Sequence, residues 1–203
     1  MQIHPALLIL FVGLLYVIGF GGLSLLRQQG LSIRFAVEGL VITALGTVLV
    51  FASVPVHPLL FLVVLYLVTM RVRLLIDLGN WFAGRARYDR ALALYRLARR
   101  LWPDRSGEQL VLINRGVTEL HMNDPETAYH TLLGVLSDEH TRTGARHVSA
   151  ALYNLGLASR RTGREAEALR RFNEAVDACP ASIYAQAAQR AIEEAKKSGS
   201  APA

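Results

Sequence analysis

Residues 78–103 read LGNWFAGRARYDRALALYRLARRLWP, and residues 155–180 read LGLASRRTGREAEALRRFNEAVDACP. Both segments begin with Leu-Gly, and both place alanine, an aromatic residue, alanine and proline at the same distances behind that glycine. Shared positions at fixed spacing indicate an internal repeat. A middle segment around Gly116 fits less completely, with Ala128, Leu132 and Val135 at the corresponding places. The chain therefore contains three related units.

These positions resemble the tetratricopeptide repeat, in which a first helix carries Leu-Gly and a second helix carries Ala, an aromatic residue, Ala and Pro. Glycine and alanine fit where the two helices cross closely. Proline ends the second helix because it has no amide hydrogen and disfavours helix at the preceding residue. Gly163 indicates the turn inside the last unit. The middle unit departs from the pattern, since Arg115 stands where leucine is expected and no proline closes the unit.

The resemblance implies the architecture of residues 71–197. It predicts helical hairpins at about residues 71–104, 109–137 and 149–180. We expect one further helix at residues 181–197, because a solenoid needs a polar cap over its last apolar surface. Residues 198–203 are expected to form a disordered tail.

Residues 1–76 are expected to form a membrane domain. Residues 6–26 contain no charged side chain, and a helix of that length spans about 30 Å, the thickness of a bilayer's hydrocarbon core. Apolar stretches at about 35–54 and 58–76 predict two more spans. The N-terminus lacks the features of a cleaved signal peptide, so the first span is expected to be retained. The fold class is thus all-α: three transmembrane helices, then a tetratricopeptide-like α-solenoid of about three hairpins with a capping helix.

The charged residues predict an orientation. Residues 1–70 contain two basic residues and one acidic residue, whereas residues 71–203 contain 20 basic and 15 acidic residues. Arg27 and Arg34 lie in the first loop, the second loop has no basic residue, and many follow the third span. By the positive-inside rule the N-terminus then lies outside and the repeats lie in the cytoplasm. We expect an integral protein of a bacterial inner membrane.

Nine arginines lie between residues 71 and 105, directly after the last apolar stretch. We expect this basic excess to contact the anionic headgroups of a lipid bilayer. The residues expected at the membrane surface are Arg71, Arg73, Arg85 and Arg87. A protein that binds nucleic acid would spread its positive charge over a face or a tail, so no nucleic-acid partner is expected.

Small residues on the predicted spans indicate close helix packing. Gly39, Thr43 and Gly46 share one face of the second span with Val50, and small residues let membrane helices approach. We expect this face to pack within the chain, and the glycines at positions 13, 19, 21 and 22 to act in the same way on the first span.

Glu38 lies in the first turn of the second span, where its carboxylate can reach the membrane interface. The alternative is that Glu38 forms a proton or ion site.

The sequence shows no pattern of a catalytic or cofactor site. It has no glycine-rich phosphate loop, no His-Glu-x-x-His, no paired cysteines and no Gly-x-Ser-x-Gly. The single cysteine, Cys179, is expected to be structural. We therefore expect no enzyme activity, no cofactor and no bound metal. The oligomeric state stays open.

The resemblance also implies a peptide-binding groove along the first helices of the hairpins. The polar residues carried over to this groove are Arg73, Asn80, His121, Tyr153, Asn154, Arg160 and Arg161. Their amide and guanidinium groups suit a peptide backbone or carboxylate. We expect a membrane-anchored protein that binds or scaffolds partner proteins at the cytoplasmic face, in the assembly of a membrane complex. The alternative is an accessory subunit of a transport or enzyme complex that acts through its membrane helices.

The orientation can be tested with a reporter fused after Ala203. Because the basic residues cluster behind the last apolar stretch, we expect the reporter to be active only on the cytoplasmic side. The same reporter fused before Met1 should be active on the opposite side. An exoplasmic signal from the C-terminal fusion would contradict the orientation.

Overall fold

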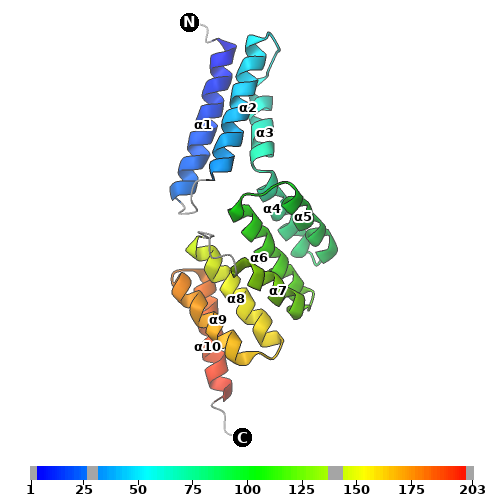
Figure 1. Cartoon of the computed structure of the whole chain (residues 1–203), viewed down its shortest axis with the longest axis vertical. Coiled ribbons are helices and arrows are strands. Elements are labelled where there is room, and N and C mark those ends of the chain that lie inside the picture. Colours follow the sequence, from blue (N-terminus) through cyan, green and yellow to red (C-terminus); the bar gives the residue numbers. More distant parts are fainter. Residues whose placement is uncertain (1–3, 27–31, 137–143, 200–203) are drawn as a thin grey trace. The chain divides into compact units, whose positions relative to one another are not determined.

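The structure is a computed structural model that describes residues 4–26, 32–136 and 144–199. All regular elements in these ranges are helices, labelled α1 to α10 (Figure 1), so the all-α prediction is confirmed. The chain forms two compact units, Met1–Leu74 and Leu75–Ala203. Each unit has its own buried side chains, and each is described separately below.

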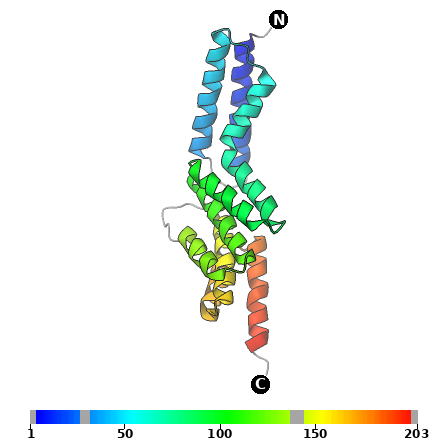
Figure 2. The same ribbon diagram turned by 90° about the vertical axis from the view of Figure 1, so that its right-hand side faces the viewer.

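The first unit is built from α1 (Pro5–Leu26), α2 (Ile33–Phe51) and α3 (Pro58–Thr69), which lie side by side (Figures 1 and 2). Gly13 of α1 lies against Thr43 of α2, so a Cβ there would overlap the threonine side chain. A Cβ on Gly46 would lie 2.7 Å from Cε2 of Phe61 in α3. The small residues predicted on the second span therefore do pack within the chain.

The glycines near the end of α1 behave differently from the prediction. A Cβ on Gly19 or Gly22 would meet no atom within 4 Å. Neither residue marks a helix crossing, because α1 packs through Gly13 and the buried side chains Ile9, Tyr16 and Val17.

Most of the large apolar side chains of the first unit face outward. Examples are Phe11, Ile18 and Phe51, each more than half exposed. Among the described residues, α1 and α2 are long and apolar enough to cross a membrane, and a third span results only if α3 and the next helix, which meet at a bend, are taken together. A water-soluble unit would turn these side chains inward, since their burial is favourable.

The third span, predicted as one helix over residues 58–76, is two helices. α3 ends at Thr69 and α4 (Arg71–Ala83) begins after Met70. Arg71 Nη1 donates to the carbonyl oxygen of Val68 at 2.6 Å, which satisfies an acceptor at the end of α3. The Arg71 guanidinium also holds Glu38 of α2, through Nη1 at 2.6 Å and Nη2 at 2.9 Å. This local bonding favours a helix end that apolar composition alone does not reveal.

The second unit contains helical hairpins. The pairs are α4 with α5 (Tyr88–Arg100), α6 (Arg105–His121) with α7 (Pro125–Leu136), and α8 (Ala145–Arg161) with α9 (Glu165–Ala178). In each pair the glycine of the first helix faces the large side chain predicted for the second: Gly79 with Tyr95, Gly116 with Leu132, and Gly156 with Phe172. The middle unit packs like the other two despite its incomplete pattern.

The three hairpin turns share one backbone geometry. Ala86, Asn123 and Gly163 have positive φ angles of 56°, 61° and 77°, and each lies seven residues after the glycine of its hairpin. The amide after each turn residue donates to the carbonyl oxygen five positions back, at 2.9, 3.0 and 2.9 Å. Glycine and asparagine adopt this conformation readily, whereas alanine loses about 1–2 kcal/mol in it. Only the turn at Gly163 was evident from the sequence.

The last helix, α10 (Ile183–Gly199), packs on α8 and α9 at the C-terminal end of the series (Figure 2). Ser182 caps it by accepting a hydrogen bond from the amide of Ala185 at 3.0 Å. The stripe Ala185, Ala188 and Ala191 is buried against the preceding hairpin. The helix continues to Gly199, so the predicted tail begins later than residue 198, and residues 200–203 lie outside the described residues.

The close crossing of α8 and α9 predicts the effect of one added methyl group. A Cβ on Gly156 would lie 2.6 Å from Cε1 of Phe172, a rigid ring that is 1% exposed. We expect Gly156→Ala to lower the free energy of unfolding by about 1–3 kcal/mol. The measurement is denaturant unfolding of the full chain in detergent, followed by circular dichroism.

Gly134 of α7 is the matched control for this change. A Cβ there would meet no atom within 4 Å. Gly134→Ala should therefore be neutral or stabilise the chain by about 0.5–1 kcal/mol. Equal effects of the two substitutions would contradict the role of close helix approach.

Candidate peptide-binding face

The first helices of the second and third hairpins are neighbours, since α6 contacts α8, and α8 in turn contacts α10. Each hairpin glycine points at its second helix. Three positions on each first helix lie about 100–160° around the helix axis from that glycine, at 3.6 residues per turn. They are the positions two residues before the glycine, one residue after it and five residues after it. Their side chains therefore point away from the second helix. We call these six positions the A-helix face: Asn114, Val117 and His121 on α6, and Asn154, Leu157 and Arg161 on α8.

Two asparagines occupy the same position of the A-helix face. The amide nitrogens of Asn114 and Asn154 donate to the carbonyl oxygens four residues back, at 2.7 and 2.8 Å. Asn114 is half-buried, whereas the predicted site residue Asn154 is buried, at 6% exposure. Asn154 was predicted as a site residue, whereas Asn114 was missed. The repeat register would have identified it, because both precede their glycine by two residues.

His121 and Arg161 lie at the C-terminal ends of α6 and α8, and both are exposed. Arg161 Nη1 donates to the carbonyl oxygen of Leu120 at 2.7 Å, beside His121 in the chain. This bond brings the two predicted residues to the same end of the A-helix face. The face therefore combines asparagine amides with a guanidinium and an imidazole at one end.

Tyr153 and Arg160 were predicted in the groove, but they pack on the other side of α8. The ring of Tyr153 lies 5.9 Å from that of Phe172 and 6.3 Å from that of Tyr184. The Arg160 guanidinium lies 5.7 Å from the Phe172 ring. Both positions are only about 40–60° of helix rotation from Gly156, so their side chains lean toward α9. They stabilise the packing of α8, α9 and α10.

Asn80 is tied to its own hairpin. The hydroxyl of Tyr95 donates to Oδ1 of Asn80 at 2.6 Å. Burial raises the pKa of the Tyr95 phenol above its ordinary value of 10.0, and a hydrogen bond with Thr118 opposes that shift. Tyr95 therefore joins α4 and α5 to α6, and Asn80 orients this tyrosine.

The four residues predicted at a membrane surface have different environments. Arg71 is half-buried in its ion pair with Glu38. The guanidinium of Arg85 lies 3.6 Å from the centroid of the Trp81 ring. Arg73 and Arg87 are exposed, and Arg73 belongs to the first compact unit rather than to the repeat unit. Contact of these residues with lipid, and of Arg73 with a peptide, stays a prediction.

No metal centre is evident in the part of the chain that the structure describes. Within residues 4–26, 32–136 and 144–199, no three His, Cys, Asp or Glu side chains come together to hold a metal ion.

Comparison with known proteins identifies the fold. No family model matches the sequence, and no curated protein is significantly similar to it. Among solved structures, the TPR2AB-domain:pHSP90-complex of yeast Sti1 is similar, with a TM-score of 0.55 and 21% sequence identity over 64% of this chain. The match covers 49% of the Sti1 chain, so this chain spans about half the length of that protein chain. The likeness shows a tetratricopeptide-like fold.

The buried hydrogen bond of Tyr95 predicts a pH-dependent effect of Tyr95→Phe. At neutral pH the variant should lose about 0.5–1.5 kcal/mol of unfolding free energy, because it lacks the bond to Asn80. The raised pKa means that this contribution is complete below about pH 10 and is lost as the pH rises through the pKa of the folded state. Denaturant unfolding at about pH 8 and pH 11 should show the difference shrink.

Tyr184→Phe is the control for removing a phenol hydroxyl at neutral pH. Tyr184 is half-buried, and its hydroxyl forms no hydrogen bond with any residue of the described ranges. Its substitution should have little effect on the unfolding free energy at neutral pH, because no hydrogen bond is lost. A constant effect of Tyr95→Phe across this range would contradict the assignment.

Proposed function

We propose that the chain is a membrane-anchored protein that binds and scaffolds partner proteins through the A-helix face, at the cytoplasmic side of a bacterial inner membrane, in the assembly of a membrane complex. The observation that supports this most is the pair His121 and Arg161, both exposed at the same end of two adjacent first helices. The amide of Asn114, which is half-buried on the same face, can bond a peptide group of an extended segment.

The polar end of the A-helix face favours a partner with a carboxylate. His121 and Arg161 are exposed there, and a guanidinium binds a carboxylate with charge-assisted hydrogen bonds. Arg161 uses Nη1 for the Leu120 carbonyl oxygen, and a guanidinium has four further N–H donors. The similar Sti1 domain is in a complex with pHSP90, which gives a precedent for a protein partner on this fold.

The first unit supports the anchor. Two of its helices are long and apolar enough to cross a bilayer, and their large side chains face outward. The basic excess after residue 70 supports the cytoplasmic orientation. The alternative, activity through the membrane helices, is less favoured because Glu38 accepts from both Arg34, at 2.7 Å, and Arg71. Both carboxylate oxygens of Glu38 already accept hydrogen bonds from these arginines.

The binding proposal is tested with a photo-crosslinking amino acid at position 121 in native membranes. His121 is exposed at the end of the A-helix face, whereas Tyr153 and Arg160 are half-buried against the Phe172 ring. We expect one dominant crosslinked protein, identified by mass spectrometry. Arg161→Gln should lower its yield about 10–150-fold, which corresponds to the loss of a hydrogen bond to a charged group.

The same amino acid at position 170 is the control. Arg170 is 62% exposed on α9 and lies outside the A-helix face. It should give little or none of the crosslinked partner. The proposal fails if position 121 captures no protein, or if both positions capture the same proteins equally.

A further inference from the structure

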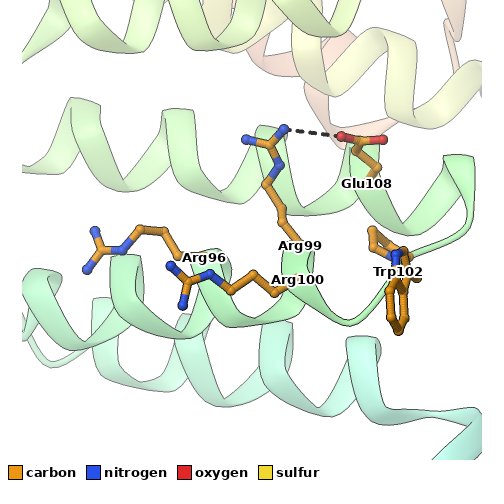
Figure 3. Close-up of a pocket in the computed structure, with 6 residues that line it drawn as sticks. Arg96, Arg99, Arg100, Trp102 and Glu108 are labelled. Carbon is orange, nitrogen blue, oxygen red and sulfur yellow. Dashed lines mark hydrogen bonds and ion pairs between the residues drawn. The ribbon is translucent and has the colours of Figure 1, made fainter.

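A hollow of about 440 Å³ lies between the end of α5 and the start of α6, away from the A-helix face. Its lining consists of Arg96, Arg99, Arg100, Trp102, Pro103 and Glu108. Figure 3 shows the guanidinium groups of Arg96 and Arg100 on one side of the hollow and Trp102 on the other. Three guanidinium groups beside an open space form a local environment suited to an anion.

Two of these arginines lack an internal counter-charge. Arg99 Nη2 lies 3.3 Å from Oε1 of Glu108. The side chains of Arg96 and Arg100 form no ion pair or hydrogen bond with any residue that the structure describes. They stand four residues apart on one helix, where like charges repel each other. An anion held between them would relieve that repulsion.

The dipole of α5 explains only part of this arginine cluster. Cations in the last turn of a helix interact favourably with its dipole, which suits Arg99 and Arg100. Arg96 lies a full turn earlier, where this effect has faded. The dipole therefore does not account for the whole cluster.

Trp102 is displayed rather than buried. Its side chain is 78% exposed, and its φ of 47° is in the left-handed region, which is rare for a bulky residue. Backbone strain of this kind concentrates at functional positions. Leu97, between Arg96 and Arg100 in the chain, is also 43% exposed. Exposed tryptophan and leucine beside arginines are typical of surfaces that enter the headgroup region of a bilayer.

We propose that this hollow binds the phosphate of an anionic phospholipid headgroup, with Arg96 and Arg100 holding the phosphate oxygens and Trp102 entering the interface. This inference rests on the proposed membrane anchor, and it adds a lipid site separate from the four arginines predicted at the membrane surface. A tryptophan presented to solvent gains little from a free anion, whereas the headgroup region accommodates both its apolar ring and its N–H. This favours a lipid over free phosphate.

The test uses the full chain with Trp81→Phe, so that Trp102 is the single tryptophan. The chain is reconstituted into nanodiscs of phosphatidylcholine, alone or mixed with increasing phosphatidylglycerol, and quenching of Trp102 by acrylamide is measured. We expect phosphatidylglycerol to shield Trp102 in a saturable way. Each arginine near an anionic surface contributes about fivefold in affinity, so Arg96→Gln with Arg100→Gln should weaken the shielding by phosphatidylglycerol about 25-fold.

Arg170→Gln with Arg190→Gln is the matched control, because it removes the same charge from exposed positions on α9 and α10. The control should keep the shielding. Several outcomes overturn the inference: no effect of phosphatidylglycerol, equal loss in both double variants, or equal shielding by inorganic phosphate in neutral discs. A chain that enters neither kind of disc refutes the anchor and this site with it. A chain that enters both, with Trp102 unchanged, refutes the site alone.

Discussion

The repeat unit depends on three glycines that let each first helix touch its second helix without a side chain between them. At Gly116 and Gly156, a Cβ would lie 2.6 Å from a large buried side chain of the second helix. Each glycine therefore decides which face of its helix points inward. All other positions follow in steps of about 100°. The A-helix face is the consequence of this choice rather than a separate feature of the sequence.

The same register also determines the turns. Seven residues after each glycine the backbone is left-handed, whether the residue is alanine, asparagine or glycine. The residue type at this position does not set the geometry, since Ala86 adopts it against its own preference. Packing of the hairpin must outweigh that local cost. The first unit uses small residues in a related way, because a Cβ on Gly39 would lie 2.6 Å from Val17 and one on Gly46 would lie 2.7 Å from Phe61.

Features that repeat were predictable from the sequence, and features that depend on one unrepeated contact were not. The spacing of glycine, alanine and aromatic residues predicted the hairpins, including the middle one with Arg115. The break at Met70 follows from one arginine that bonds both a helix end and Glu38. The packing of Tyr153 was not predicted for a similar reason: its neighbours Phe172 and Tyr184 come from two other helices. The position of a residue in the repeat predicts the direction of its side chain only approximately. Contact with a nearby aromatic ring determines the final orientation.

Comparison of equivalent positions in the repeats also shows which residues the fold requires and at which positions it accepts other residue types. Counted from their glycines, Arg96 and Arg100 of α5 correspond to Asn173 and Asp177 of α9. Both helices form the second arm of a hairpin, and both bury alanine and an aromatic ring at the required positions. The fold therefore accepts a neutral or an acidic residue where α5 has arginine.

On α9 the charges are also matched, since Arg171 reaches both Glu167 and Glu174. On α5, whose acidic residue in the first turn is Asp89, no such pairing reaches Arg96 or Arg100 within the described residues. The arginines of α5 therefore differ from the equivalent residues of α9 in a way that helix packing does not require. This difference indicates that they have a role other than stabilising the fold. Unmatched charge of one sign on a surface is stabilised only by solvent or by a partner of the opposite sign.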